Sequence, residues 1–232
     1  MSLSWAASTL SWWSDAGVDV IVGEEPRDWL TIAPKAARKA SATAPPAKAP
    51  LPAELEQFQA WLMSSTEVPG AAPSAPRLGP AGNPEAAIMV LTDFPTLKDF
   101  SSGRLISSQG LFDKMLGAIQ LSRENIYLAS LSPLRPPTGT LPPEALRRWG
   151  EIARHHIALV APKAVLLLGD VCAKVLVGSA VNQSRSKWHE IETNGARFRA
   201  LVTLKPEQLS LQPNLKKLAW SDLQMLNEGI AE

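Results

Sequence analysis

The sequence has very little cysteine: Cys172 is the single one among 232 residues. A disulfide framework, a thiolate zinc site and a cysteine-ligated iron–sulfur cluster each need several sulfur ligands, so all three are excluded. We therefore expect a reducing, cytoplasmic compartment. An apolar run of about 18 residues is also missing, as is a basic N-terminal segment followed by an apolar one, so we expect neither a membrane span nor a signal peptide.

Neither sign of charge is in excess, because 23 Lys and Arg residues oppose 22 Asp and Glu residues and leave a formal net charge of +1. The basic surplus of many nucleic-acid-binding proteins is absent, so any such binding must come from local patches. A glycine-rich phosphate-binding motif does not follow the first predicted strand, which argues against a small-molecule enzyme on a doubly wound sheet. The hydrophobic content of 45% is typical of a globular chain with a buried core.

Three parts of unequal length can be distinguished by composition. Residues 1–32 are rich in Trp, and we predict a short amphipathic helix and an extended stretch that pack on the main domain. Residues 33–52 are rich in Ala and Pro and hold four basic but no acidic side chains, which predicts a linker; a basic strap near phosphates is the alternative. Residues 53–232 form the predicted main domain.

Within the main domain, apolar runs alternate with amphipathic segments. Strands are predicted at 86–91, 125–131, 165–168 and 197–204, and helices at 53–64, 108–120, 142–160, 170–177 and 213–229. Strands this apolar indicate a parallel sheet that is covered on both faces. The predicted fold class is α/β, a three-layer α/β/α domain with a four-stranded parallel central sheet.

Ligands of such sheets bind beyond the carboxyl ends of the strands, where the loops converge. The loops after the first, second and fourth predicted strands span 92–95, 130–137 and 204–209, and each contains a stiffening proline. Together they supply a carboxylate, a guanidinium and an ammonium. We expect the functional site at this edge.

Further motifs lie in order between about residues 84 and 227. They are Gly103-Arg104, Gly110 to Leu116, Leu121 to Tyr127, Arg135-Pro136-Pro137, Pro162 to Gly169, Lys187 to Glu190, and Lys216 to Leu223. With this ordered set the chain resembles the uracil-DNA glycosylase superfamily, nearest to its bacterial and archaeal branch, which usually carries an iron–sulfur cluster. The resemblance implies a pocket for a base flipped out of DNA and hydrolysis of its N-glycosidic bond in base excision repair.

The resemblance also indicates two catalytic residues, both altered in this chain. Residues 92–96 read Thr-Asp-Phe-Pro-Thr where the family has Gly-Glu-Ala/Gly-Pro-Gly, so the family's acid falls on Asp93. The family's histidine falls on Lys205. We expect Asp93 to position water and Lys205 to support charge on the leaving base. The alternative for Asp93 is that it caps the turn after the strand.

The base pocket implied by the resemblance is altered as well. Thr92, Phe94 and Pro95 are expected to line it, and Thr92, Phe94 and Thr96 would narrow or reshape it, because small family residues, mostly glycines, let the backbone approach a ligand closely at these three positions. Ile106 replaces a stacking aromatic ring. Ser130 replaces an asparagine that reads uracil, so bidentate reading of uracil is expected to be lost.

DNA contacts are expected from residues late in the chain. Leu209 and Leu211 are candidates for a wedge that fills the space left by a flipped base. Arg135, Lys216 and Lys217 are candidates for phosphate contacts, with an ordinary solvated face as the alternative. Leu134 and Trp149 stand where the family has cluster cysteines, so neither a cluster nor another cofactor or metal is expected.

Two classes of function remain. One is a divergent monofunctional DNA glycosylase that acts as a monomer on single- or double-stranded DNA. The other is a catalytically inactive DNA-binding or protein-interaction module that retains the fold. Replacement of the acid, the aromatic ring, the amide and the histidine together is what redirected or relaxed selection would leave.

Overall fold

The computed structural model describes Trp12 and residues 50–72, 74–107, 110–193 and 195–231. The predicted segment 1–32 and the predicted linker 33–52 lie outside the described residues, apart from Trp12 and residues 50–52. The chain from Pro50 onward forms one unit. Among the helices of the described part, none is long and apolar enough to cross a membrane.

Four parallel strands form the centre of the sheet, as the apolar runs predict. They are β2 (Ile88–Thr92), β3 (Tyr127–Ser130), β4 (Ala164–Leu168) and β6 (Ala196–Thr203), in the spatial order β3-β2-β4-β6. Every residue of β2, β3 and β4 is buried. Strands that are buried on both faces need no polar alternation, which explains their continuous apolar sequence.

The prediction of a four-stranded sheet is wrong at both edges. The sheet has six strands, because β1 (Ala81–Gly82) pairs antiparallel with β3, and β5 (Trp188–Thr193) pairs antiparallel with β6. Strand β1 is only two residues long and lies in a Pro- and Gly-rich segment. In β5 only Ile191 and Thr193 are buried, so this edge strand lacks the apolar run on which the prediction relied.

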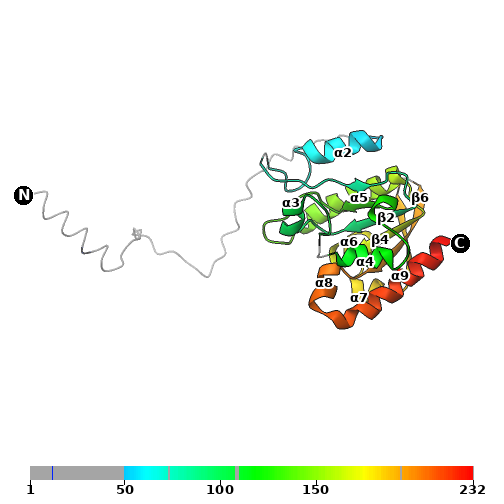
Figure 1. Ribbon diagram of the computed structural model, residues 1–232. Coiled ribbons are helices and arrows are strands. Elements are labelled where there is room, and N and C mark those ends of the chain that lie inside the picture. The colour runs from blue at the N-terminus through cyan, green and yellow to red at the C-terminus, as the bar shows by residue number, and fades with distance from the viewer. Residues whose placement is uncertain (1–11, 13–49, 73, 108–109, 194, 232) are drawn as a thin grey trace, which may run out of the picture. The chain divides into compact units, whose positions relative to one another are not determined.

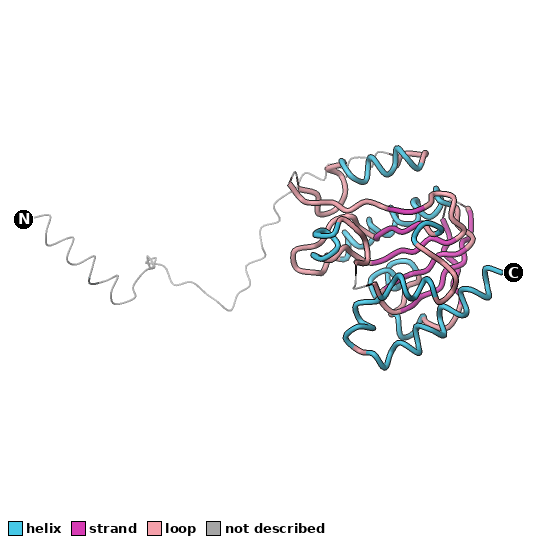
Figure 2. The backbone as a smooth tube through the Cα atoms, in the orientation of Figure 1, coloured by secondary structure: helices cyan, strands magenta, loops and turns pink. Residues whose placement is uncertain are grey.

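Helices lie on both sides of the sheet. Figure 1 shows α2 and α5 on one side and α4, α8 and α9 on the other, and the tube in Figure 2 shows the strands between them. The helices are α2 (Leu55–Ser64), α3 (Leu97–Ser102), α4 (Leu111–Gly117), α5 (Pro143–Val160), α6 (Asp170–Leu176), α7 (Val181–Ser184), α8 (Pro206–Leu211) and α9 (Lys216–Ala231), with 3₁₀ turns η1 (Arg123–Asn125) and η2 (Pro213–Leu215). The five predicted helices are confirmed, whereas the short helices α3, α7 and α8 were not predicted.

The carboxyl ends of the four parallel strands lie level with one another. Thr92 pairs in register with both Ser130 and Leu168, and Leu168 pairs with Thr203. The residues that follow these four positions therefore meet at one edge of the sheet, which is where the sequence predicts the site.

Candidate functional site

A partly buried ion pair lies at this edge. The Nζ atom of Lys205 is 2.7 Å from Oδ2 of Asp93, and the two side chains are 29% and 5% exposed. Asp93 follows β2 and Lys205 follows β6, so the pair spans the end of β4, which lies between these strands. The structure thus brings the two predicted catalytic residues into direct contact.

Gly169 makes this contact possible. It follows β4 with a φ of +110°, and a Cβ there would lie 2.3 Å from Cε of Lys205 and 2.5 Å from Oδ2 of Asp93. Real Cβ atoms do not approach other atoms so closely, and an L side chain rarely adopts this backbone conformation. The lysine stem and the carboxylate therefore meet over a position that only glycine fits.

The second carboxylate oxygen of Asp93 is also engaged. The backbone N–H of Cys172 in α6 donates to Oδ1 at 2.7 Å. Burial, with the neighbouring Asp93 carboxylate as a smaller cause, raises the pKa of the Cys172 thiol well above its usual value. The cysteine is thus a protonated, buried side chain, in agreement with its interpretation as a small apolar residue.

A further carboxylate, that of Glu207, lies close enough to Lys205 and Asp93 for their charges to act on its pKa. Burial raises the pKa of Glu207; a backbone hydrogen bond and the charge of Lys205 lower it in part, and the charges of Asp99 and Asp93 add to the rise. Glu207 lies in the first turn of α8, two residues after Lys205. The carboxyl ends of β2 and β6 therefore bring the Lys205 ammonium together with two acidic side chains, Asp93 and Glu207.

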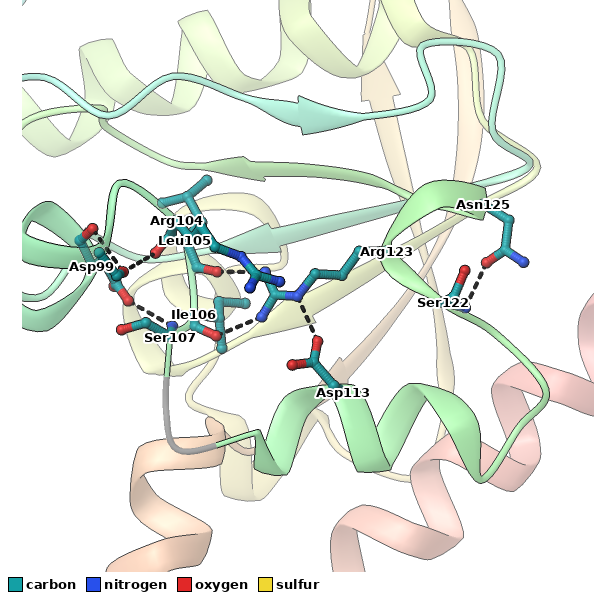
Figure 3. A network of polar contacts seen from close by, with 10 residues as sticks. Asp99, Arg104, Leu105, Ile106, Ser107, Asp113, Ser122, Arg123 and Asn125 are labelled. Atoms are coloured by element: carbon teal, nitrogen blue, oxygen red, sulfur yellow. Dashed lines mark hydrogen bonds and ion pairs between the residues drawn. The ribbon is translucent and has the colours of Figure 1, made fainter.

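The loop of residues 103–107, which carries Ile106, is held by hydrogen bonds from two sides (Figure 3). On one side, Oδ1 of Asp99 accepts the backbone N–H of Ser107 at 2.7 Å. On the other, the guanidinium of Arg123 donates to the carbonyl oxygens of Leu105 and Ile106, both at 2.7 Å, and pairs with Asp113. These contacts hold Ile106 at a φ of +52°, which is costly for a β-branched residue, with its side chain 3% exposed.

The other predicted pocket residues lie mostly inside the protein. Thr92, Pro95 and Ser130 are buried and Phe94 is half-buried. The hydroxyl of Ser130 donates to the carbonyl oxygen of Ser132 at 2.8 Å. That donor is already used within the protein, so a base at this position would meet a hydroxyl oxygen rather than a free donor.

The five residues predicted to contact DNA differ in exposure. Arg135, Lys216 and Lys217 are exposed, and Arg135 donates to the carbonyl oxygen of Pro95 at 3.4 Å, next to the site. Leu211 is 84% exposed at the end of α8, whereas Leu209 is 1% exposed. Of the two leucines considered as a wedge, Leu211 alone has its side chain in solvent.

Comparison with known proteins identifies the family of the chain. A family model described as the uracil DNA glycosylase superfamily matches residues 80–224, which is more than half of the chain. The chain belongs to the uracil-DNA glycosylase superfamily. The sequence is also similar to the type-4 uracil-DNA glycosylase of Archaeoglobus fulgidus, with 23% identity over 156 residues that cover 63% of this chain and 78% of that protein.

The bacterial and archaeal branch that the sequence resembles usually carries an iron–sulfur cluster. The residues present in this chain do not fit such a cluster. The resemblance places two family cysteines at Leu134 and Trp149, whose side chains are 5% and 0% exposed and offer no ligand for iron. Cys172, the single cysteine of the sequence, donates its backbone N–H to Asp93 instead. No cluster of three or more His, Cys, Asp or Glu side chains suited to a metal occurs in the part of the chain that the structure describes.

Sequence reasoning missed four contributors to the site. Gly169 and the backbone N–H of Cys172 meet Asp93 from a distant part of the sequence, whereas Asp99 binds the nearby Ser107 and Glu207 lies two residues after Lys205. A signal existed for Gly169, because it directly follows the apolar strand β4, just as Asp93 follows β2. The predicted site drew only on the loops after the first, second and fourth predicted strands, and so left this glycine out.

Proposed function

We propose that this superfamily member is a divergent DNA glycosylase that hydrolyses the N-glycosidic bond of uracil or another altered base. The observation that carries the proposal is the contact of Asp93 with Lys205 at the carboxyl ends of β2 and β6. A carboxylate and a cation side by side are what base release needs, because positive charge develops on the sugar while negative charge develops on the leaving base.

Each member of the pair has a separate role in the proposed reaction. Asp93, held by the N–H of Cys172, faces the sugar and positions the attacking water. Lys205 has the more exposed side chain and turns towards the leaving base, whose negative charge it stabilises.

The pocket residues favour a base that is read differently from uracil in the family. Ser130 offers one hydroxyl oxygen, and its proton is donated to Ser132. Ile106 offers an aliphatic contact where an aromatic face would stack. We therefore expect the pocket to select a base by its shape rather than by paired hydrogen bonds. Deaminated purines should be tested as substrates beside uracil.

A second candidate function is a catalytically inactive module that binds DNA or protein. The specific observation in its favour is that both oxygens of Asp93 already have partners, Lys205 and the N–H of Cys172. A buried carboxylate that is satisfied in this way also fits a purely structural role.

The two candidates are separated by an assay of base release. The full chain is incubated with labelled oligonucleotides that contain uracil, hypoxanthine or xanthine, in single and double strands, and abasic sites are then cleaved with alkali. We expect strand breaks at one altered base and intact strands for the normal sequence. Intact strands throughout, together with salt-dependent DNA binding, would favour the inactive module.

A further inference from the structure

Lys205 gives the site a primary amine in a position where the resemblance to the superfamily places a histidine. An imidazole cannot condense with an aldehyde to form an imine, whereas a lysine amine can. The sugar left after base release is in equilibrium with an open-chain form that carries an aldehyde at C1′. The substitution therefore allows a reaction with the product of base release.

The surroundings of Lys205 orient this amine. Its backbone forms the N-cap of α8, and Pro206 fixes the φ angle of the first helical residue. Its stem crosses Gly169, where a Cβ would come within 2.3 Å of Cε, and its Nζ ends 2.7 Å from Asp93. Since the lysine side chain is 29% exposed and the aspartate 5%, the amine is the member of the pair that an incoming sugar meets first.

We propose that Lys205 forms an imine with the aldehyde of an abasic site, which gives this protein a DNA lyase activity. This inference rests on the proposed function insofar as it places DNA at the same site. The amine has a proton acceptor in contact, Asp93, and a further carboxylate nearby, Glu207. Both are suited to the proton transfers of the reaction.

The steps balance without an oxidant or reductant. The Lys205 ammonium transfers a proton to Asp93, and the free Nζ adds to C1′ to give a carbinolamine. Its hydroxyl takes the proton back from Asp93 and leaves as water, which produces the protonated imine and restores the Asp93 carboxylate. A carboxylate then removes a proton from C2′, the C3′–O bond breaks and the 3′ phosphate departs, and water finally hydrolyses the imine to restore the amine.

Borohydride trapping on a ready-made abasic site tests the proposal. The full chain is mixed with an oligonucleotide that carries a natural abasic site, and sodium borohydride is added to reduce any imine to a stable amine. We expect a covalent protein–DNA complex, and none with a tetrahydrofuran analogue, which has no aldehyde. Since the substrate is supplied without a base, failure of base release leaves this result unaffected, and failure of trapping leaves base release unaffected.

Two variants and one mapping experiment locate the amine. Lys205→Arg keeps a positive charge beside Asp93, so the buried carboxylate stays paired, but its guanidinium is not a nucleophile. We expect trapping to fall about tenfold or more. The control Lys163→Arg changes an exposed lysine just before β4, at the amino ends of the strands and away from the site. We expect this variant to form as much trapped complex as the unmodified protein.

Mass spectrometry of the trapped unmodified protein gives an answer that does not depend on the folding of a variant. We expect the adduct on the peptide that contains Lys205. An adduct on another amine, undiminished trapping in Lys205→Arg, or no trapped complex at all would each overturn the proposal.

Discussion

At the scale of single residues, Gly169 is needed for two reasons, its backbone conformation and the space above its Cα atom. It lies at a φ of +110°, and its α-hydrogen faces the space in which Lys205 and Asp93 meet. A side chain at this position would therefore impose both backbone strain and a collision with the charged pair. Another glycine of the chain, Gly178, has a φ of +85°, but a Cβ added there would have nothing within 4 Å.

These two glycines give a matched test of the site's packing. Gly178→Ala should cost only the backbone strain, about 1 kcal/mol of unfolding free energy. Gly169→Ala should cost clearly more, about 2–4 kcal/mol, and should abolish base release, because the new methyl group displaces the ion pair. Urea denaturation of both variants checks the difference, and equal losses would show that the pair does not need this space.

At the scale of elements, the loop of residues 103–107 depends on contacts from outside it. Asp99 accepts the N–H of Ser107 from one side, and Arg123 binds two of the loop's carbonyl oxygens from the other (Figure 3). Asp99 also closes the capping box of α3 with Thr96, so the start of this helix and the loop share one carboxylate. Removing that charge is expected to loosen both.

The pH dependence of stability tests the role of Asp99. Burial by itself raises its pKa, but hydrogen bonds from Thr96 and Ser107 outweigh burial and hold the pKa below the ordinary value of 3.8. The pKa of Asp99 is lower in the folded than in the unfolded protein. The stabilisation that its charged carboxylate contributes is therefore complete above about pH 4 and is lost as the pH falls through the folded pKa. Asp99→Asn should thus cost about 1–3 kcal/mol at pH 7, with a smaller cost near pH 3.

Urea denaturation at pH 7, 5 and 3 measures this effect. The comparison variant is Asp113→Asn, because Asp113 is 48% exposed and its pairing with Arg123 should contribute less than about 1 kcal/mol. A cost for Asp99→Asn that stays the same from pH 7 to pH 3 would contradict the assignment.

At the scale of the whole molecule, the buried central strands of the sheet could be predicted from the sequence, whereas the edge strands β1 and β5 could not. The central strands are apolar throughout because both of their faces are covered, so their sequences reveal them and their carboxyl ends. Strand β5 is polar along one face and therefore resembles a loop in sequence. Asp93 and Lys205 are predicted from their positions after apolar strands and from the resemblance, but the contact between them depends on the strand order, with β4 between β2 and β6.

The central claim is that the Asp93–Lys205 pair releases a base from DNA, and a comparison of single-turnover base release by the unmodified protein and by Asp93→Asn tests it most directly. Asparagine keeps the shape and an acceptor for the N–H of Cys172 but lacks the charge. The matched control is Glu190→Gln, which removes the same charge from an exposed side chain on β5 that pairs with Arg197.

We predict that Asp93→Asn slows base release about a hundredfold or more, with DNA affinity at fixed salt within about threefold of the unmodified protein, and that Glu190→Gln changes neither quantity. Base release by Asp93→Asn at the rate of the unmodified protein, or the absence of base release from every oligonucleotide of the panel, would contradict the claim.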